Sequence, residues 1–117
     1  MNAGARDAYT FGIEEEFFLV VRRTCQPASR LSKRFVKACR SRLSDQVTYE
    51  LQQTQVEIVS PVFSDAQHAL HELIRLRRTV AEISESFGLG IIAASTHPLA
   101  LWQRQRHTDK PRYTRLI

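Results

Sequence analysis

The sequence has 117 residues, 43% of them hydrophobic and 25% charged, which is enough for one domain of ordinary size with a packed core. Its formal net charge of +5 is spread along the chain without a dense basic run, which indicates solvated helix faces and loops. The sequence has no apolar run long enough for a membrane helix and no apolar leader of the kind found in signal peptides. It also has no CxxC motif, which argues against a cysteine-based zinc site. These features predict a cytoplasmic protein with reduced thiols.

The first predicted element is a strand over residues 9–21, preceded by a loose leader. Its β-branched and aromatic residues favour a strand over a helix. Alternation places Phe11, Ile13, Phe17 and Leu19 on one face and Glu14, Glu16, Phe18 and Val20 on the other. Glu15 falls on the apolar face, where we expect it to pair with an arginine or to lie near a strand end.

The middle of the chain predicts a loop, a helix and two strands. The helix covers residues 29–43, in which Leu31, Phe35 and Cys39 form one apolar stripe. Short strands are predicted at 47–51 and 54–59. The second strand has Val56 and Ile58 on one face and Gln55, Glu57 and Val59 on the other.

The most distinct helix begins after Ser64, which with Gln67 forms a capping box, and it ends at Gly88. An apolar strand follows at residues 90–94, and the remainder to residue 117 has the polar, proline-containing composition of a loop. This order predicts an α+β fold, in which an antiparallel sheet carries helices on one face, within a single domain spanning residues 1–117.

The strand glutamates are the main candidates for chemistry. Glu14 and Glu16 point the same way, and Glu57 joins them if its strand pairs alongside. Clustered carboxylates repel one another unless a cation or protons neutralise them, and hard cations such as Mg²⁺ prefer oxygen ligands. The alternative is that all three are exposed glutamates facing water.

The histidines give weaker signals. His68 and His71 lie one helical turn apart but do not match the HExxH zinc pattern, so we interpret them as surface residues. His97 follows a predicted strand, where either a functional contact or a structural hydrogen bond is expected. The sequence has no P-loop and no GxGxxG motif.

Four stretches in order resemble the glutamate–cysteine ligase type 2 family, also called YbdK-like carboxylate–amine ligases. They are TFGIEEEFFLV at 10–20, ELQQTQVE at 50–57 with its IVSP continuation, THP at 96–98 and KPRY at 110–113. Ser60 and Ser95 depart from the residues usual in the family. The resemblance implies a glutamine-synthetase-like fold and an ATP-dependent ligase that forms an amide through an acyl phosphate.

The resemblance also implies roles for individual residues, with ATP and Mg²⁺ (or Mn²⁺) as cofactors. By position, Glu14, Glu16 and Glu57 correspond to metal ligands. The residues that it implies for substrate contact are Glu50, Gln53, Gln55, His97 and Arg112. The implied partners are small amino-acid substrates and ATP. We expect neither nucleic acid nor a membrane as a partner, and we assign no catalytic residue.

Family members are about three times as long as this chain, so we expect the N-terminal fragment of a longer ligase domain. Such a fragment needs its missing C-terminal portion or association into a homo-oligomer to cover an open sheet. Two alternatives to a ligase are a non-catalytic fragment and a small basic binding module for a polyanion.

Overall fold

A computed structural model describes residues 9–28, 31–49, 54–94, 97–101, 103 and 111–114. Its elements in chain order are β1 (Glu14–Val21), α1 (Lys33–Leu43), the 3₁₀ helix η2 (Ser44–Gln46), β2 (Val47–Tyr49), β3 (Gln55–Val59), α2 (Ala66–Ser86), β4 (Leu89–Ile92) and α3 (Pro111–Thr114).

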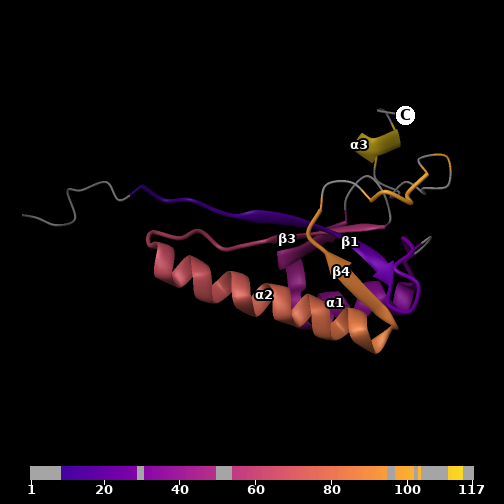
Figure 1. The fold of residues 1–117 in the computed structure, drawn as a ribbon. Coiled ribbons are helices and arrows are strands. Elements are labelled where there is room, and N and C mark those ends of the chain that lie inside the picture. Colours follow the sequence, from indigo (N-terminus) through magenta and orange to yellow (C-terminus); the bar gives the residue numbers. More distant parts are fainter. Residues whose placement is uncertain are drawn as a thin grey trace, which may run out of the picture.

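The strands form one antiparallel sheet in the order β2-β3-β1-β4. Figure 1 shows α1 and α2 on one side of this sheet, with residues 97–101 and α3 on the other side. The predicted α+β class, with both long helices on one face, is therefore confirmed. The strand containing Glu57 does pair alongside the strand containing Glu14 and Glu16.

The core lies between the sheet and the two long helices. It contains the inward side chains of three strands together with one stripe from each helix, because alternation along each strand and helical periodicity bring these positions together. Its buried members are Phe17, Leu19, Ala28, Phe35, Cys39, Leu43, Val47, Val56, Ile58, Leu76, Val80 and Ile83. Burial of these apolar side chains is the main stabilising contribution to the fold.

The ends of the helices differ in part from the prediction. α2 begins after Asp65, whose carboxylate accepts a hydrogen bond from the His68 backbone N–H at 2.8 Å, so the N-cap predicted at Ser64 was wrong. A carboxylate cap also interacts favourably with the positive end of the helix dipole. α1 likewise begins after Ser32, later than predicted. The predicted role of Gly88 is confirmed, because its φ of 72° is one that glycine adopts without strain.

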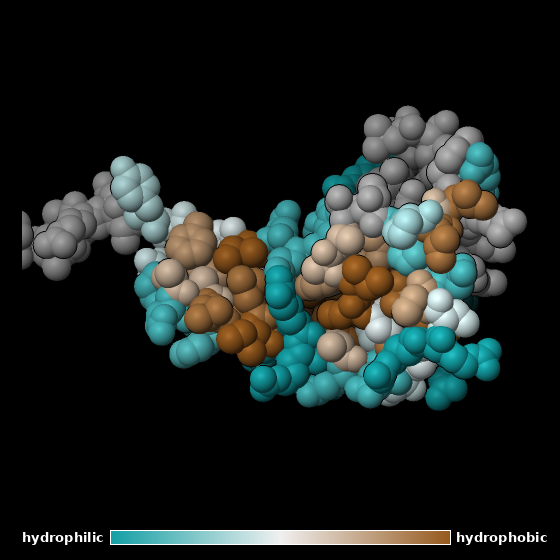
Figure 2. All heavy atoms as spheres, in the orientation of Figure 1, coloured by the Kyte–Doolittle hydropathy of each residue, from teal (hydrophilic) through white to brown (hydrophobic). Residues whose placement is uncertain are grey.

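The chain just before β1 runs along the start of α2 and pairs Phe11 with Phe63 in an isolated bridge. Figure 2 shows hydrophobic surface gathered over this end of the molecule. Leu70 and Ile74 of α2 are 51% and 43% exposed there, whereas Leu76 is fully buried. The second half of α2 therefore contributes more to the core than the first.

The tail predicted as loop contains the short helix α3, which begins at Pro111, a residue suited to the first helical position. Within the described parts of the chain, no helix combines the length and hydrophobicity needed to cross a membrane.

Candidate functional site: the carboxylate face of the sheet

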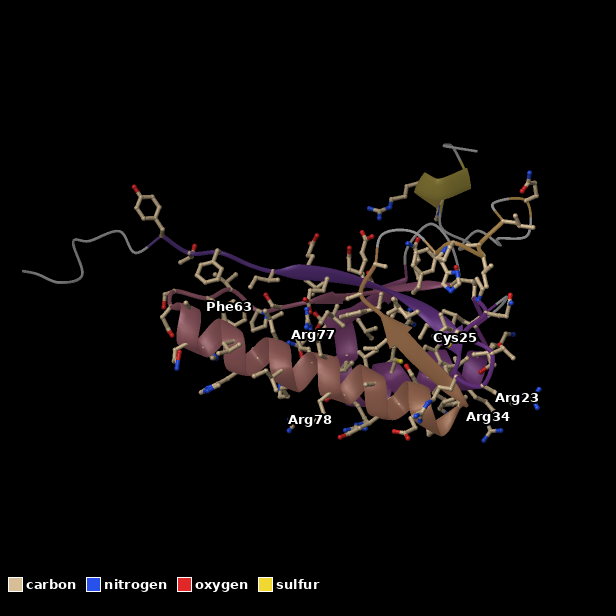
Figure 3. All side chains as sticks on the ribbon, in the orientation of Figure 1. Arg23, Cys25, Arg34, Phe63, Arg77 and Arg78 are labelled. Atoms are coloured by element: carbon tan, nitrogen blue, oxygen red, sulfur yellow. The ribbon has the colours of Figure 1, made fainter. Side chains whose placement is uncertain are left out.

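The three consecutive glutamates of β1 alternate between the two faces of the sheet and have different surroundings. Glu15 points toward the helices, where Arg77 of α2 binds both of its carboxylate oxygens. Figure 3 shows Arg77 between α2 and the sheet, while its neighbour Arg78 points away from the sheet. The Glu15 carboxylate raises the pKa of Arg77 through these hydrogen bonds. The expected pairing of Glu15 with an arginine is confirmed.

Glu14 and Glu16 lie on the opposite face, away from α1 and α2, and are exposed. Neither forms a salt bridge with a residue in the described part of the chain. On β3, Glu57 is half-buried and lies directly opposite Glu16. The strand register thus places all three predicted carboxylates on one face, which we call the carboxylate face.

The backbone hydrogen bonds show how close Glu16 and Glu57 lie. The Leu19 N–H donates to the Thr54 carbonyl, and the Ser60 N–H donates to the Ile13 carbonyl. In an antiparallel pair the hydrogen-bonded and non-hydrogen-bonded positions alternate, so Glu16 and Glu57 occupy a non-hydrogen-bonded pair. Their Cα atoms are therefore about 4.5 Å apart, the closest cross-strand spacing. Two like charges at this spacing destabilise the sheet unless a neighbour or a bound ion compensates them.

The other half of the same face is apolar. Phe18 and Val20 are buried there, and the ring of His97 packs edge-on against Phe18 with centroids 6.0 Å apart. The Leu99 backbone N–H donates to His97 Nδ1 at 3.0 Å, which fixes the proton on Nε2, and Nε2 in turn donates to the Cys25 carbonyl at 2.9 Å. His97 therefore ties the chain after β4 to the turn after β1, and its predicted substrate contact stays a prediction.

Two open hollows meet at Glu57. One is lined by Glu14, Glu15, Glu16, Glu57, Ala93 and Ala94. The other is lined by Thr48, Glu57, Pro111 and Arg112, so α3 brings an arginine to the carboxylate face. The Glu57 carboxylate accepts a hydrogen bond from the Thr48 hydroxyl at 3.1 Å. The site therefore places carboxylates, a hydroxyl and a guanidinium next to one another.

A model of Glutamate-cysteine ligase family 2 (GCS2) matches residues 10–117 of this chain. The chain belongs to this family.

Curated members of glutamate–cysteine ligase family 2 are similar over most of the chain. A protein of Ectopseudomonas mendocina named "Putative glutamate--cysteine ligase 2" is 43% identical over 89% of the chain and 28% of its own length. Proteins of the same name from Bradyrhizobium sp. (strain BTAi1) and Jannaschia sp. are 39% and 43% identical, over 93% and 92% of the chain. The chain spans about 28% of the length of these relatives.

The donor set on the carboxylate face suits a hard divalent cation, because all of its members offer carboxylate oxygens. Within the described residues, however, no three acidic, histidine or cysteine side chains converge closely enough to form a cage. Mg²⁺ does not require one, since it usually binds through one or two carboxylates, water and substrate phosphates. The close pair Glu16 and Glu57, with Glu14 on the same face, fits that mode.

The structure places only some of the other residues predicted to contact substrate near Glu57. Gln55 lies on the carboxylate face, because it is two residues before Glu57 on β3 and pairs with Phe18. Arg112 lines the hollow beside Glu57. Glu50 and Gln53 lie outside the described residues. Sequence reasoning missed Thr48, because the register of β2 was needed to place its hydroxyl opposite Glu57.

Proposed function

We propose that this chain supplies the metal-binding carboxylates of an ATP- and Mg²⁺-dependent carboxylate–amine ligase. The reaction would join glutamate to cysteine. ATP would phosphorylate the substrate carboxylate, the amine would attack the acyl phosphate, and ADP and phosphate would leave. The sheet would form part of the curved sheet of a glutamine-synthetase-like fold. Membership of glutamate–cysteine ligase family 2 supports the reaction class.

The observation that carries the proposal is the close pair Glu16 and Glu57 on the face of the sheet away from α1 and α2. Two carboxylates this close on an open face supply the oxygen ligands that a hard divalent cation prefers. Mg²⁺, when bound, would neutralise negative charge on the carboxylates and on the phosphates of ATP. Glu14, Glu16 and Glu57 would hold it.

The other residues of the face would orient the substrates. Arg112, beside Glu57, carries the positive charge needed to bind an anionic group of a substrate or nucleotide. Gln55 offers an amide on the same face. The same acidic face disfavours the alternative of a polyanion-binding module, because carboxylates repel phosphates.

The test is calorimetric titration of the chain with Mg·ATP. Glu14→Gln and Glu57→Gln should each lower the affinity about tenfold or more, since a charge-assisted contact contributes ~1.5–3 kcal/mol. Glu82→Gln is the matched control, because Glu82 lies on α2 and pairs with Arg42 away from the carboxylate face. Affinities equal to that of the parent chain in both site variants would refute the assignment, and so would a parent chain that binds no Mg·ATP.

A further inference from the structure

β2 adds a hydroxyl group to the carboxylate face at a defined position. Thr48 lies directly opposite Glu57 in the register of β2 and β3. Its Oγ1 donates a hydrogen bond to Glu57 Oε1 at 3.1 Å, and both residues are half-buried. Glu57 therefore has Thr48 on one neighbouring strand and Glu16 on the other.

The hydrogen bond from Thr48 restricts the mobility of the Glu57 side chain. A glutamate side chain has several rotatable bonds, and fixing it costs up to about 2 kcal/mol of conformational entropy. Repulsion from Glu16 on the adjacent strand adds to the tendency of the carboxylate to move. The hydroxyl bond from Thr48 opposes both effects, because it holds one carboxylate oxygen at a fixed place on the face.

We propose that Thr48 is a positioning residue for Glu57, which fixes the orientation in which this carboxylate meets a divalent cation. The proposal rests on the proposed function, because it takes Glu57 to be a metal ligand. Carboxylates that bind metals are themselves commonly hydrogen-bonded, and loss of such an outer partner typically lowers metal affinity about 10- to 100-fold. Thr48 is the residue of the described β2 strand whose hydroxyl makes this bond.

Thr48 also has a purely structural explanation, since threonine is a good strand former whatever its hydroxyl contacts. The two explanations separate on substitution. Thr48→Val keeps the branched shape and removes the hydroxyl, whereas Thr48→Ser keeps the hydroxyl and removes the methyl group. A structural role predicts effects on stability alone, while a positioning role predicts an effect on metal affinity that follows the hydroxyl.

The experiment is titration of the chain with Mn²⁺, with the free ion followed by electron paramagnetic resonance and with thermal melting of each variant as a check on folding. We expect Thr48→Val to weaken Mn²⁺ binding about tenfold and Thr48→Ser to change it less than about twofold. Thr48→Ala, which also lacks the hydroxyl, gives the same comparison if the valine variant does not fold.

The outcomes distinguish this inference from the proposed function. If Glu57→Gln weakens Mn²⁺ binding and Thr48→Val does not, or if Thr48→Val tightens it, the role of Thr48 is overturned and the metal site stands. If Glu57→Gln leaves Mn²⁺ binding unchanged, or the parent chain binds no Mn²⁺, the metal site itself is overturned and the role of Thr48 with it.

Discussion

Glu15 and Glu16 are neighbours on β1, yet the two faces of the sheet give them opposite surroundings. Glu15 lies under α2, its side chain is 18% exposed, and Arg77 binds it through two oxygens. Glu16 is exposed on the carboxylate face and lies opposite another carboxylate, Glu57. On the covered face Arg77 thus neutralises Glu15 within the fold, whereas the carboxylate face brings Glu16 next to a second carboxylate.

Substitutions of apolar residues on β3 should show the largest difference between the two faces in the free energy of unfolding. Ile58 is fully buried on the covered face, and the adjacent Val59 is half-buried on the carboxylate face. Ile58→Ala should lower the free energy of unfolding by about 2–5 kcal/mol, because it leaves a cavity in the core. Val59→Ala should cost about 1 kcal/mol or less. Urea unfolding measures both, and equal losses would mean that both faces are packed alike.

Neutralising a glutamate of β1 should have the next largest effect on the free energy of unfolding. Glu15→Gln should lower the free energy of unfolding by about 1 kcal/mol or less, because Arg77 loses its partner but is 52% exposed. Glu16→Gln should raise it by a few tenths of a kcal/mol, because repulsion from Glu57 is relieved. Urea unfolding in metal-free buffer makes the comparison. A stabilising Glu15→Gln together with a destabilising Glu16→Gln would reverse the account of the two faces.

A glutamate on α2 should contribute less to stability than the buried side chains of β3, in a way that depends on pH. The Arg75 side chain donates hydrogen bonds to the Glu72 carboxylate and lowers the pKa of Glu72 below its usual value of 4.5. A carboxylate whose pKa is lower in the folded state stabilises the fold fully above its unfolded pKa. That contribution is lost as the pH falls through the folded pKa.

Glu72→Gln should therefore cost ~0.5 kcal/mol of the free energy of unfolding at pH 7, where both partners are charged. The difference between parent and variant should disappear in acid, once Glu72 is protonated in the folded protein. Unfolding measured at pH 7 and at acidic pH values below 4.5 follows this change. A difference that grew in acid would contradict the direction of the pKa shift.

Much of this contrast was predictable from the sequence, because period-two alternation assigns each side chain of β1 to a face without knowledge of the partner strand. The same rule identified Glu15 as a charge on an apolar face, for which either an arginine partner or a place near a strand end was expected, and the structure shows the arginine. Alternation does not state which strands are neighbours. The direct pairing of Glu16 with Glu57, and of Glu57 with Thr48, followed only from the tertiary register.

Two neighbouring candidates for the N-cap explain the wrong prediction at the start of α2. Ser64 and Asp65 both had the chemistry of an N-cap, and the structure selects Asp65, whose charged carboxylate binds the His68 N–H.

The role of His97 could not be decided from the sequence for a different reason. A histidine in a loop serves a ligand or the fold equally well by sequence, and only the positions of Leu99 and Cys25 showed both ring nitrogens bonded within the chain.

Mn²⁺ affinity, compared between Glu16→Gln and Glu15→Gln, tests most directly whether the carboxylate face holds a cation. Both variants remove one negative charge from adjacent positions of β1, so a nonspecific electrostatic effect would weaken binding equally in both. If the carboxylate face holds the cation, Glu16→Gln should weaken Mn²⁺ binding about tenfold or more, and Glu15→Gln should leave it within about twofold of the parent chain. Equal affinities in the two variants, or a larger loss in Glu15→Gln, would contradict the account.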